Sequence, residues 1–159
     1  SVIVSLALFL TAFVMAPTFE QAYDSGIEPL INEEIDEATA LAATIAPFHA
    51  FMRQHARERD IVMFSDMTST PPLEAPEDLS LRILVPAFMI GELKRAFEIG
   101  FLIFVPFVII DMVVASVLMS MGMMMLPPII IALPFKLIFF VMVDGWSMIA
   151  GSLVQSFNR

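Results

Sequence analysis

Residues 112–135 form a run of 24 residues without a charged side chain, and this run limits what the chain can fold into. About 20 apolar residues in a helix are enough to cross the hydrocarbon core of a bilayer. The chain is 58% hydrophobic, with a mean hydropathy of +0.85, whereas soluble domains are roughly 45–50% apolar. The sequence therefore predicts a membrane protein.

Prolines interrupt this run at Pro127, Pro128 and Pro134. Proline removes a backbone hydrogen bond from a helix and clashes with the preceding turn. We expect two hydrophobic helices, at about residues 97–126 and 129–156, that fold as a hairpin at the double proline. Lipid-facing backbone must be hydrogen-bonded, so such a break is tolerated only against protein or a water-filled lumen. The hairpin thus indicates a chain that assembles with other subunits.

Charge divides the chain into three parts. Residues 1–19 are uncharged and predict a first hydrophobic helix, which we expect to be truncated at its N-terminus because it is slightly short of a full span. Residues 20–80 form an acidic helical insert and linker, and positions 20–78 hold thirteen acidic and three basic side chains. Residues 81–159 form the hydrophobic hairpin with its methionine-rich loop. The expected fold is all-α, with integral membrane-type hairpins and a water-facing insert.

Helical spacing is present within the insert. One stripe is expected at Ile31, Ile35, Ala38 and Ala42, with acidic residues on the opposite face. A second helix is expected after Pro47, and the proline-rich residues 70–76 predict a linker.

Several classes of function are disfavoured by composition. The chain has no cysteine, which excludes disulfides, thiol catalysis and cysteine-ligated metals. Its net charge of −9 argues against nucleic acid, which binds clustered Lys and Arg. His49 and His55 are poorly spaced for two ligands on one helical face, and the common catalytic motifs do not occur. We expect no catalytic residues, no metal and no cofactor.

Six of the thirteen methionines lie between Met112 and Met125, just before the double proline. Methionine is flexible and polarisable, so it fills irregular gaps between packed helices. The cluster is therefore compatible with simple packing, and the spacing of Met119, Met121 and Met123 resembles a thioether site for Cu(I). A copper site is disfavoured because no Cys or His is nearby and alternate residues point to different sides of a helix. The third interpretation is a soft apolar seal at a constriction.

Ionisable groups within the apolar block are costly in lipid and usually face partners, water or a proton path. They include Glu92, Asp111, Lys136 and Asp144. Lys136 needs a carboxylate partner, and Glu92 and Arg95 are spaced for a local helical pair. Because ionisable groups at membrane depth can also form a proton or ion path, an alternative function is an ion- or proton-coupled transporter that uses Glu92, Asp111 and Lys136.

Long stretches of the second block resemble the FliP family of flagellar type III export-gate proteins, which is related to the SctR components of injectisomes. These stretches are residues 85–104, residues 106–128, Leu133-Pro-Phe-Lys136 and Val143-Asp-Gly-Trp146. The resemblance extends over residues 1–159 and is weaker in the acidic insert. It implies a non-enzymatic conduit for unfolded flagellar proteins in the bacterial inner membrane and flagellar basal body, with the insert on the periplasmic side.

The resemblance also assigns expected roles to particular residues. It implies that five copies assemble into an oligomeric pore with FliQ and FliR, beside FlhB. It places the pore gasket at Met123, Met124 and Met125 with Met121 nearby, and the loop break at Pro127 and Pro128. It maps subunit-assembly ion pairs onto Arg57, Glu92 and Lys136, with Glu92 as a partner of Lys136 or Arg57 across subunits, and insert packing onto Phe51 and Phe64. The family pattern has a hydroxyl residue where this chain has Gly91. We also expect the family's signal and first hydrophobic segment to be missing, which would leave the first membrane element incomplete.

Overall fold

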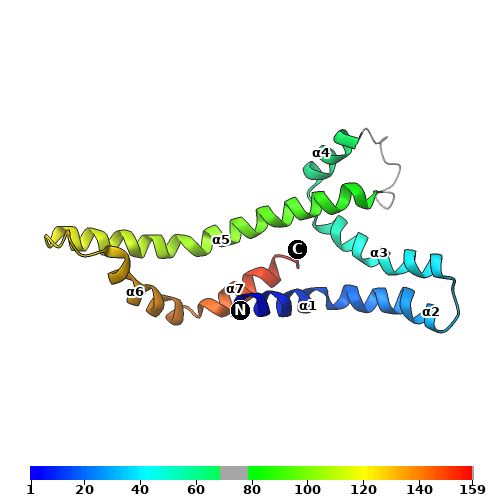
Figure 1. The fold of residues 1–159 in the computed structure, drawn as a ribbon, viewed down its shortest axis with the longest axis horizontal. Helices are drawn as coiled ribbons and strands as arrows, with labels where there is room; N and C mark the ends of the chain where they lie inside the picture. Colours follow the sequence, from blue (N-terminus) through cyan, green and yellow to red (C-terminus); the bar gives the residue numbers. More distant parts are fainter. Residues whose placement is uncertain (69–78, 159) are drawn as a thin grey trace. The chain divides into compact units, whose positions relative to one another are not determined.

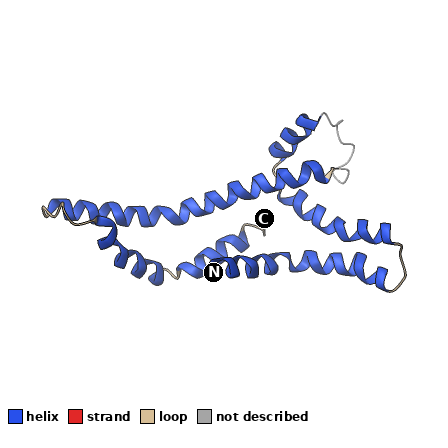
Figure 2. Ribbon diagram, viewed as in Figure 1, coloured by secondary structure: helices blue, strands red, loops and turns tan. Residues whose placement is uncertain are grey.

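The computed structural model describes residues 1–68 and 79–158, and every element within these ranges is a helix (Figures 1 and 2). The elements are α1 (Val2–Ala22), the π-helix η1 (Tyr23–Ile27), α2 (Glu28–Ile31), α3 (Glu37–His55), α4 (Glu58–Thr68), α5 (Leu81–Ser120), α6 (Pro128–Met142) and α7 (Gly145–Gln155). This confirms the all-α class. The expected linker at residues 70–76 lies outside the described residues.

Two segments are long and apolar enough to cross a membrane, namely Val2–Ile31 and Leu81–Ser120. A third candidate is the pair formed by α6 and α7, which is bent by 60°. The charges of α5 are concentrated in its first half, and from Ile99 to Ser120 only Asp111 is charged. These lengths and compositions agree with the predicted membrane protein.

The chain divides into two compact units, residues 1–94 and 95–159. In the first unit α1 and η1 pack against α3 (Figure 1). Thr18, Ala22 and Gly26 are buried and four residues apart. A Cβ at Gly26 would lie 2.1 Å from Oγ1 of Thr44 and 2.8 Å from the carbonyl oxygen of Ala40. The absence of a side chain at Gly26 therefore allows the two backbones to approach closely.

The expected helical stripe from Ile31 to Ala42 is wrong, because a turn between α2 and α3 interrupts it. Glu33 has a φ of 58°, and the N–H groups of Glu33 and Glu34 donate to the carbonyls of Leu30 (3.1 Å) and Pro29 (2.9 Å). This bonding pattern is a Schellman cap, which ends α2 before the stripe is complete. The periodic spacing crosses a chain reversal, so these residues do not share one helix.

Helix α3 starts at Glu37, directly after this turn. Asp36 is its N-cap residue, and the Thr39 hydroxyl donates a hydrogen bond to the Asp36 carboxylate. This bond lowers the pKa of Asp36, because it favours the charged form.

Two prolines lie inside helices, and one of them was expected to precede a helix. α1 continues through Pro17, and α3 continues through Pro47 rather than starting after it. A proline inside a helix removes one backbone hydrogen bond, and packing against a neighbouring helix can offset that loss. Close to Pro47, Phe48 contacts Phe19 of α1 edge-on, with ring centroids 5.6 Å apart.

A small core joins the end of the insert to the start of α5. Its buried members are Ile61, Leu79, Ile83, Leu84 and Ala87, and the partly buried Met52, Ala56 and Phe64 pack against it. His49 reaches the same region, because its Nε2 lies 2.7 Å from the carbonyl oxygen of Leu79. These contacts hold α3, α4 and the first turns of α5 together.

The second unit contains a sharp bend between α6 and α7. Asp144 has a φ of 52° in the left-handed region, and its N–H donates to the carbonyl of Val141 at 3.2 Å. Gly145 is buried directly beneath the Phe140 ring, which also contacts Trp146 edge-on at 5.3 Å. The single helix expected at residues 129–156 is therefore two helices.

Candidate functional site

The methionine-rich loop begins where α5 ends, and the backbone of its first turn is closely defined. Gly122 has a φ of +74°, the left-handed conformation that glycine adopts without strain. The Gly122 N–H donates to the carbonyl of Met119 at 3.1 Å, and the Met123 N–H donates to that of Leu118 at 2.9 Å. This is a second Schellman cap, and it satisfies carbonyls that the end of the helix would leave unpaired.

The two prolines lie at the end of the reversal, where they start the next helix. Pro127 is the N-cap residue of α6 and Pro128 is its first residue. Proline suits this position because its missing N–H would have no partner in the first turn and its φ is already helical. The reversal therefore extends from Met121 to Pro127, and α5 ends at Ser120 rather than near residue 126. Gly122 and Pro128 bracket the loop.

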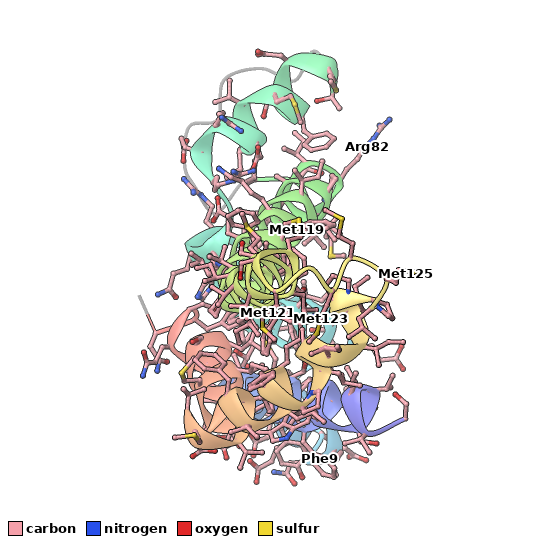
Figure 3. The ribbon with its side chains drawn as sticks, turned by 90° about the vertical axis from the view of Figure 1, so that its left-hand side faces the viewer. Phe9, Arg82, Met119, Met121, Met123 and Met125 are labelled. Atoms are coloured by element: carbon pink, nitrogen blue, oxygen red, sulfur yellow. The ribbon has the colours of Figure 1, made fainter. Side chains whose placement is uncertain are left out.

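The methionines of the loop are exposed to very different extents. Met125 is 98% exposed, Met124 is 79% exposed and Met123 is 41% exposed. Figure 3 looks onto this end of α5 and shows Met119 across the helix from Met121 and Met123, with Met125 farther out on the loop. The loop thus presents several uncovered thioether side chains on a capped backbone.

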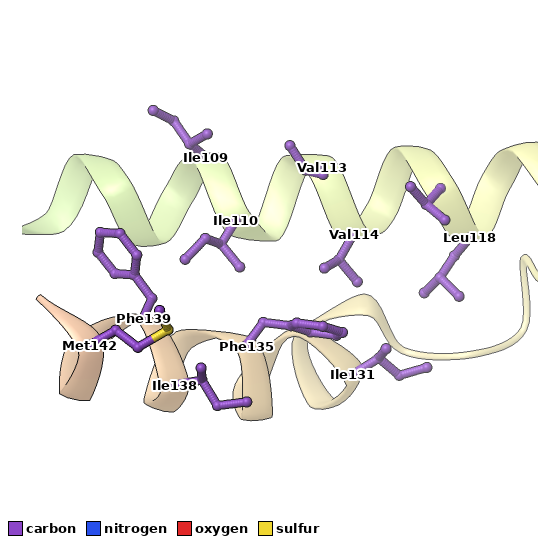
Figure 4. A pocket seen from close by; sticks show the side chains of 11 residues that line it. Ile109, Ile110, Val113, Val114, Leu118, Ile131, Phe135, Ile138, Phe139 and Met142 are labelled. Carbon is purple, nitrogen blue, oxygen red and sulfur yellow. The ribbon is translucent and has the colours of Figure 1, made fainter.

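An apolar groove lies between α5 and α6, next to the loop (Figure 4). Its volume is about 620 Å³, and its walls include Ile110, Val114 and Leu118 from α5 and Ile131 and Phe135 from α6. Farther along the hairpin, Phe107 contacts Phe139 edge-on with ring centroids 6.0 Å apart. The two helices of the hairpin are therefore in direct contact through aromatic rings and are separated by the groove closer to the loop.

An ion pair joins the same two helices. Nζ of Lys136 on α6 lies 2.7 Å from Oδ1 of Asp111 on α5, and both side chains are half-buried. The sequence indicated that Lys136 needs a carboxylate partner, and within this chain that partner is Asp111. Because both charges lie in apolar helices, their pairing favours this alignment of α6 with α5.

We expect replacement of Gly122 by alanine to destabilise the hairpin modestly. A Cβ there meets nothing within 4 Å, so the cost comes from the left-handed backbone alone, about 1–2 kcal/mol. The thermal unfolding midpoint of the detergent-solubilised protein should fall by a few degrees. Gly122→Asn is the matched control and should lose less, because asparagine tolerates this conformation. Equal losses for alanine and asparagine would contradict this account of the cap.

Comparison with known proteins assigns the chain to a family. The model of the FliP family matches residues 1–153. The chain belongs to the FliP family. It is 58% identical over 158 residues to the flagellar biosynthetic protein FliP of Caulobacter vibrioides, an alignment that covers 99% of this chain and 59% of the relative.

Two further FliP proteins show a comparable similarity. The protein of Rhizobium meliloti is 51% identical over 98% of this chain and 64% of its own length. The protein of Bacillus subtilis is 52% identical over 98% of this chain and 71% of its own length. This FliP-family chain thus spans about three fifths to two thirds of the first two relatives and somewhat more of the third.

Arg57 has an acidic partner within the insert of this FliP-family chain. Nε of Arg57 lies 2.6 Å from Oδ2 of the buried Asp60. Gly91 of α5 faces this pair, and a Cβ there would lie 3.8 Å from Nε of Arg57 and 3.9 Å from Oδ2 of Asp60. These are ordinary contact distances, so an added methyl group fits. Glu92 follows Gly91 on α5 and is half-buried.

The two aromatic residues expected to pack the insert lie in its core region. Phe64 packs against the cluster of Ile61 and its neighbours. Phe51 contacts the ring of Phe88 edge-on at 6.0 Å. Both side chains therefore lie between the insert and the first turns of α5.

Two contacts in the second unit had no clear signal in the sequence. Arg95 was expected to make a local pair, but its Nη1 also donates to the Ser156 carbonyl at 3.2 Å. Its guanidinium carbon lies 5.3 Å from the centre of the Phe157 ring. Asp111 was expected as an ionisable group of the apolar block and of the transporter alternative, and its pairing with Lys136 depends on the hairpin alignment. Both contacts join residues that are distant in the sequence, which helical periodicity does not predict.

Proposed function

We propose that this FliP-family chain is a core pore subunit of the flagellar type III protein export gate, which seals the channel and passes unfolded flagellar proteins. The observation that carries the proposal is the loop between α5 and α6, where Met123, Met124 and Met125 are uncovered on a capped backbone. Several copies would each contribute this loop to one ring. Met121 adds a further thioether at the start of the loop.

Methionine has properties suited to such a ring. Its side chain is apolar, which disfavours water and ions in a narrow passage. It is also unbranched and flexible, so it can adapt to side chains of different shapes. A ring of these side chains would close around itself at rest and around an exported chain during transport.

The proposed assembly contains five copies with FliQ and FliR, beside FlhB, in the bacterial inner membrane at the flagellar basal body. The acidic insert would lie on the periplasmic side. Membership of the FliP family supports this arrangement, as do large exposed apolar side chains along α1 and α5, such as Phe9, Phe97 and Phe101. Arg57, Glu92 and Lys136 are proposed to contribute ion pairs between subunits.

The transporter alternative makes a different prediction for Glu92. A carrier with Glu92→Gln should remain assembled and lose ion coupling, whereas a pore subunit that uses Glu92 between subunits should fail to assemble. The close contact of Lys136 and Asp111 favours a structural role for that pair. Native gel electrophoresis of the purified complex separates the two outcomes.

We expect replacement of Met123, Met124 and Met125 by alanine in the full-length protein to make the resting membrane leak ions. The shorter side chains leave a gap in the ring while the hairpin and the loop backbone are retained. The measurement is the conductance of cells or proteoliposomes that contain the assembled complex. The control is Met67→Ala on α4, which removes a methionine that is 70% exposed outside the loop. Unchanged conductance in an assembled triple variant would rule out the gasket.

A further inference from the structure

The exposed thioether groups of the loop can react with oxidants as well as contact other protein surfaces. Five methionines lie between Met119 and Met125, and each of these side chains is at least 41% exposed. The most exposed, Met124 and Met125, lie in the middle of the loop, inside a turn in which the Leu126 N–H donates to the Met123 carbonyl at 3.4 Å. In the single chain, small oxidants can therefore reach these sulfur atoms directly, and in the proposed ring they would approach them from the lumen.

Methionine reacts with peroxides by transfer of one oxygen atom. The sulfur lone pair attacks one peroxide oxygen, the O–O bond breaks, an S=O bond forms and water leaves. Sulfur is oxidised by two electrons and hydrogen peroxide is reduced by two. The sulfoxide is polar and chiral, and sulfoxide reductases restore the thioether with two electrons and two protons from a dithiol, which releases water.

We propose that Met123, Met124 and Met125 form an oxidation site, at which peroxide converts the apolar loop into a polar one and thereby unseals the channel. The effect on sealing rests on the proposed function, whereas the oxidation itself does not. Each sulfoxide places a strong hydrogen-bond acceptor where the seal requires apolar surface, and water and ions then enter a ring that had excluded them. Repetition of the loop in several subunits multiplies the effect of a low degree of oxidation.

The loop methionines differ from other exposed methionines in their position in the chain, and not in their exposure alone. Met67 on α4 is 70% exposed, comparable to Met124, and lies in the acidic insert. It should be oxidised at a similar dose. Its sulfoxide would face water beside charged residues, so its oxidation should leave the seal unchanged.

The test uses the assembled full-length complex in proteoliposomes, with hydrogen peroxide as the probe. Peptide mass spectrometry locates sulfoxides, and conductance is followed in parallel. The informative variant replaces Met123, Met124 and Met125 by leucine, which has a similar volume and no sulfur. Its matched control is Met67→Leu.

We expect peroxide to raise the leak several-fold in the wild type and in Met67→Leu, and to leave the triple leucine variant sealed. Treatment with sulfoxide reductase should restore the wild-type seal. Absence of loop sulfoxides at doses that oxidise Met67 would overturn the proposal, as would an equal peroxide-induced leak in the triple leucine variant. Loop oxidation without any rise in leak would also overturn it. If the triple alanine variant is also tight without peroxide, the gasket itself has failed and not only its oxidation.

Discussion

Replacement of Gly26 by alanine should lower the thermal unfolding midpoint of the detergent-solubilised protein by roughly 6–12 °C, from about 3 kcal/mol of overpacking. The added Cβ would lie 2.1 Å from Oγ1 of Thr44, 2.7 Å from the Thr44 backbone nitrogen and 2.8 Å from the Ala40 carbonyl oxygen. Two of these three atoms belong to the α3 backbone. The helices must therefore separate, since no side-chain rotation relieves those two contacts.

Two variants test whether the close approach causes this loss. Gly26→Ala combined with Thr44→Ala removes only the hydroxyl contact, so it should recover part of the stability and no more. Gly91→Ala adds the same methyl group where the nearest atoms are at 3.8 Å, and it should stabilise the protein by about 1 kcal/mol through helix propensity. If Gly26→Ala and Gly91→Ala change the midpoint in the same direction, packing of η1 against α3 is not what Gly26 provides.

Replacement of Lys136 by methionine should destabilise the hairpin by about 3 kcal/mol, because it leaves the Asp111 carboxylate without its cation in an apolar helix pair. The wild-type Nζ–Oδ1 distance is 2.7 Å, and neither side chain is more than one third exposed. Circular dichroism during heating measures the loss in the isolated chain. The yield of assembled complex measures its consequence.

The double variant Lys136→Met with Asp111→Leu removes both charges and should return to near the wild-type stability. This recovery would place the partner of Lys136 within the chain. If the double variant instead assembles as poorly as Lys136→Met, Lys136 has its decisive partner in a neighbouring subunit, and Glu92 becomes the first residue to examine. The expected intersubunit role of Lys136 is therefore distinguishable from its role in the hairpin.

Composition and periodicity predicted the helical class and the apolar segments, because these depend on local chemistry. They failed at Pro47, which lies inside α3, whereas Pro127 and Pro128 begin α6 close to where the second hydrophobic helix was expected. The same residue removes one donor in each case, and whether the helix continues depends on packing that the sequence does not display.

The candidate loop could be found from its methionines, and the prolines gave the end of its reversal but not its beginning after Ser120. The informative signal was Gly122, the single glycine of the loop, because a helix end of this type requires a positive φ. Glu33 forms the same kind of cap without glycine, so the residue type did not indicate that a helix ends there. The pairing of Lys136 with Asp111 required the alignment of two helices. Residue type showed only that a partner was needed.

The capped end of α5 also determines how fast a methionine seal could close again. The hydrogen bonds at Gly122 and Met123 define the backbone at the start of the loop, so adaptation to a passing chain falls mainly to side-chain torsions. Exposed side chains change rotamer in picoseconds to nanoseconds, whereas lids and hinged domains move in microseconds to milliseconds. In the proposed pore the gap behind a departing chain would therefore close before many ions could cross, without a separate gating motion.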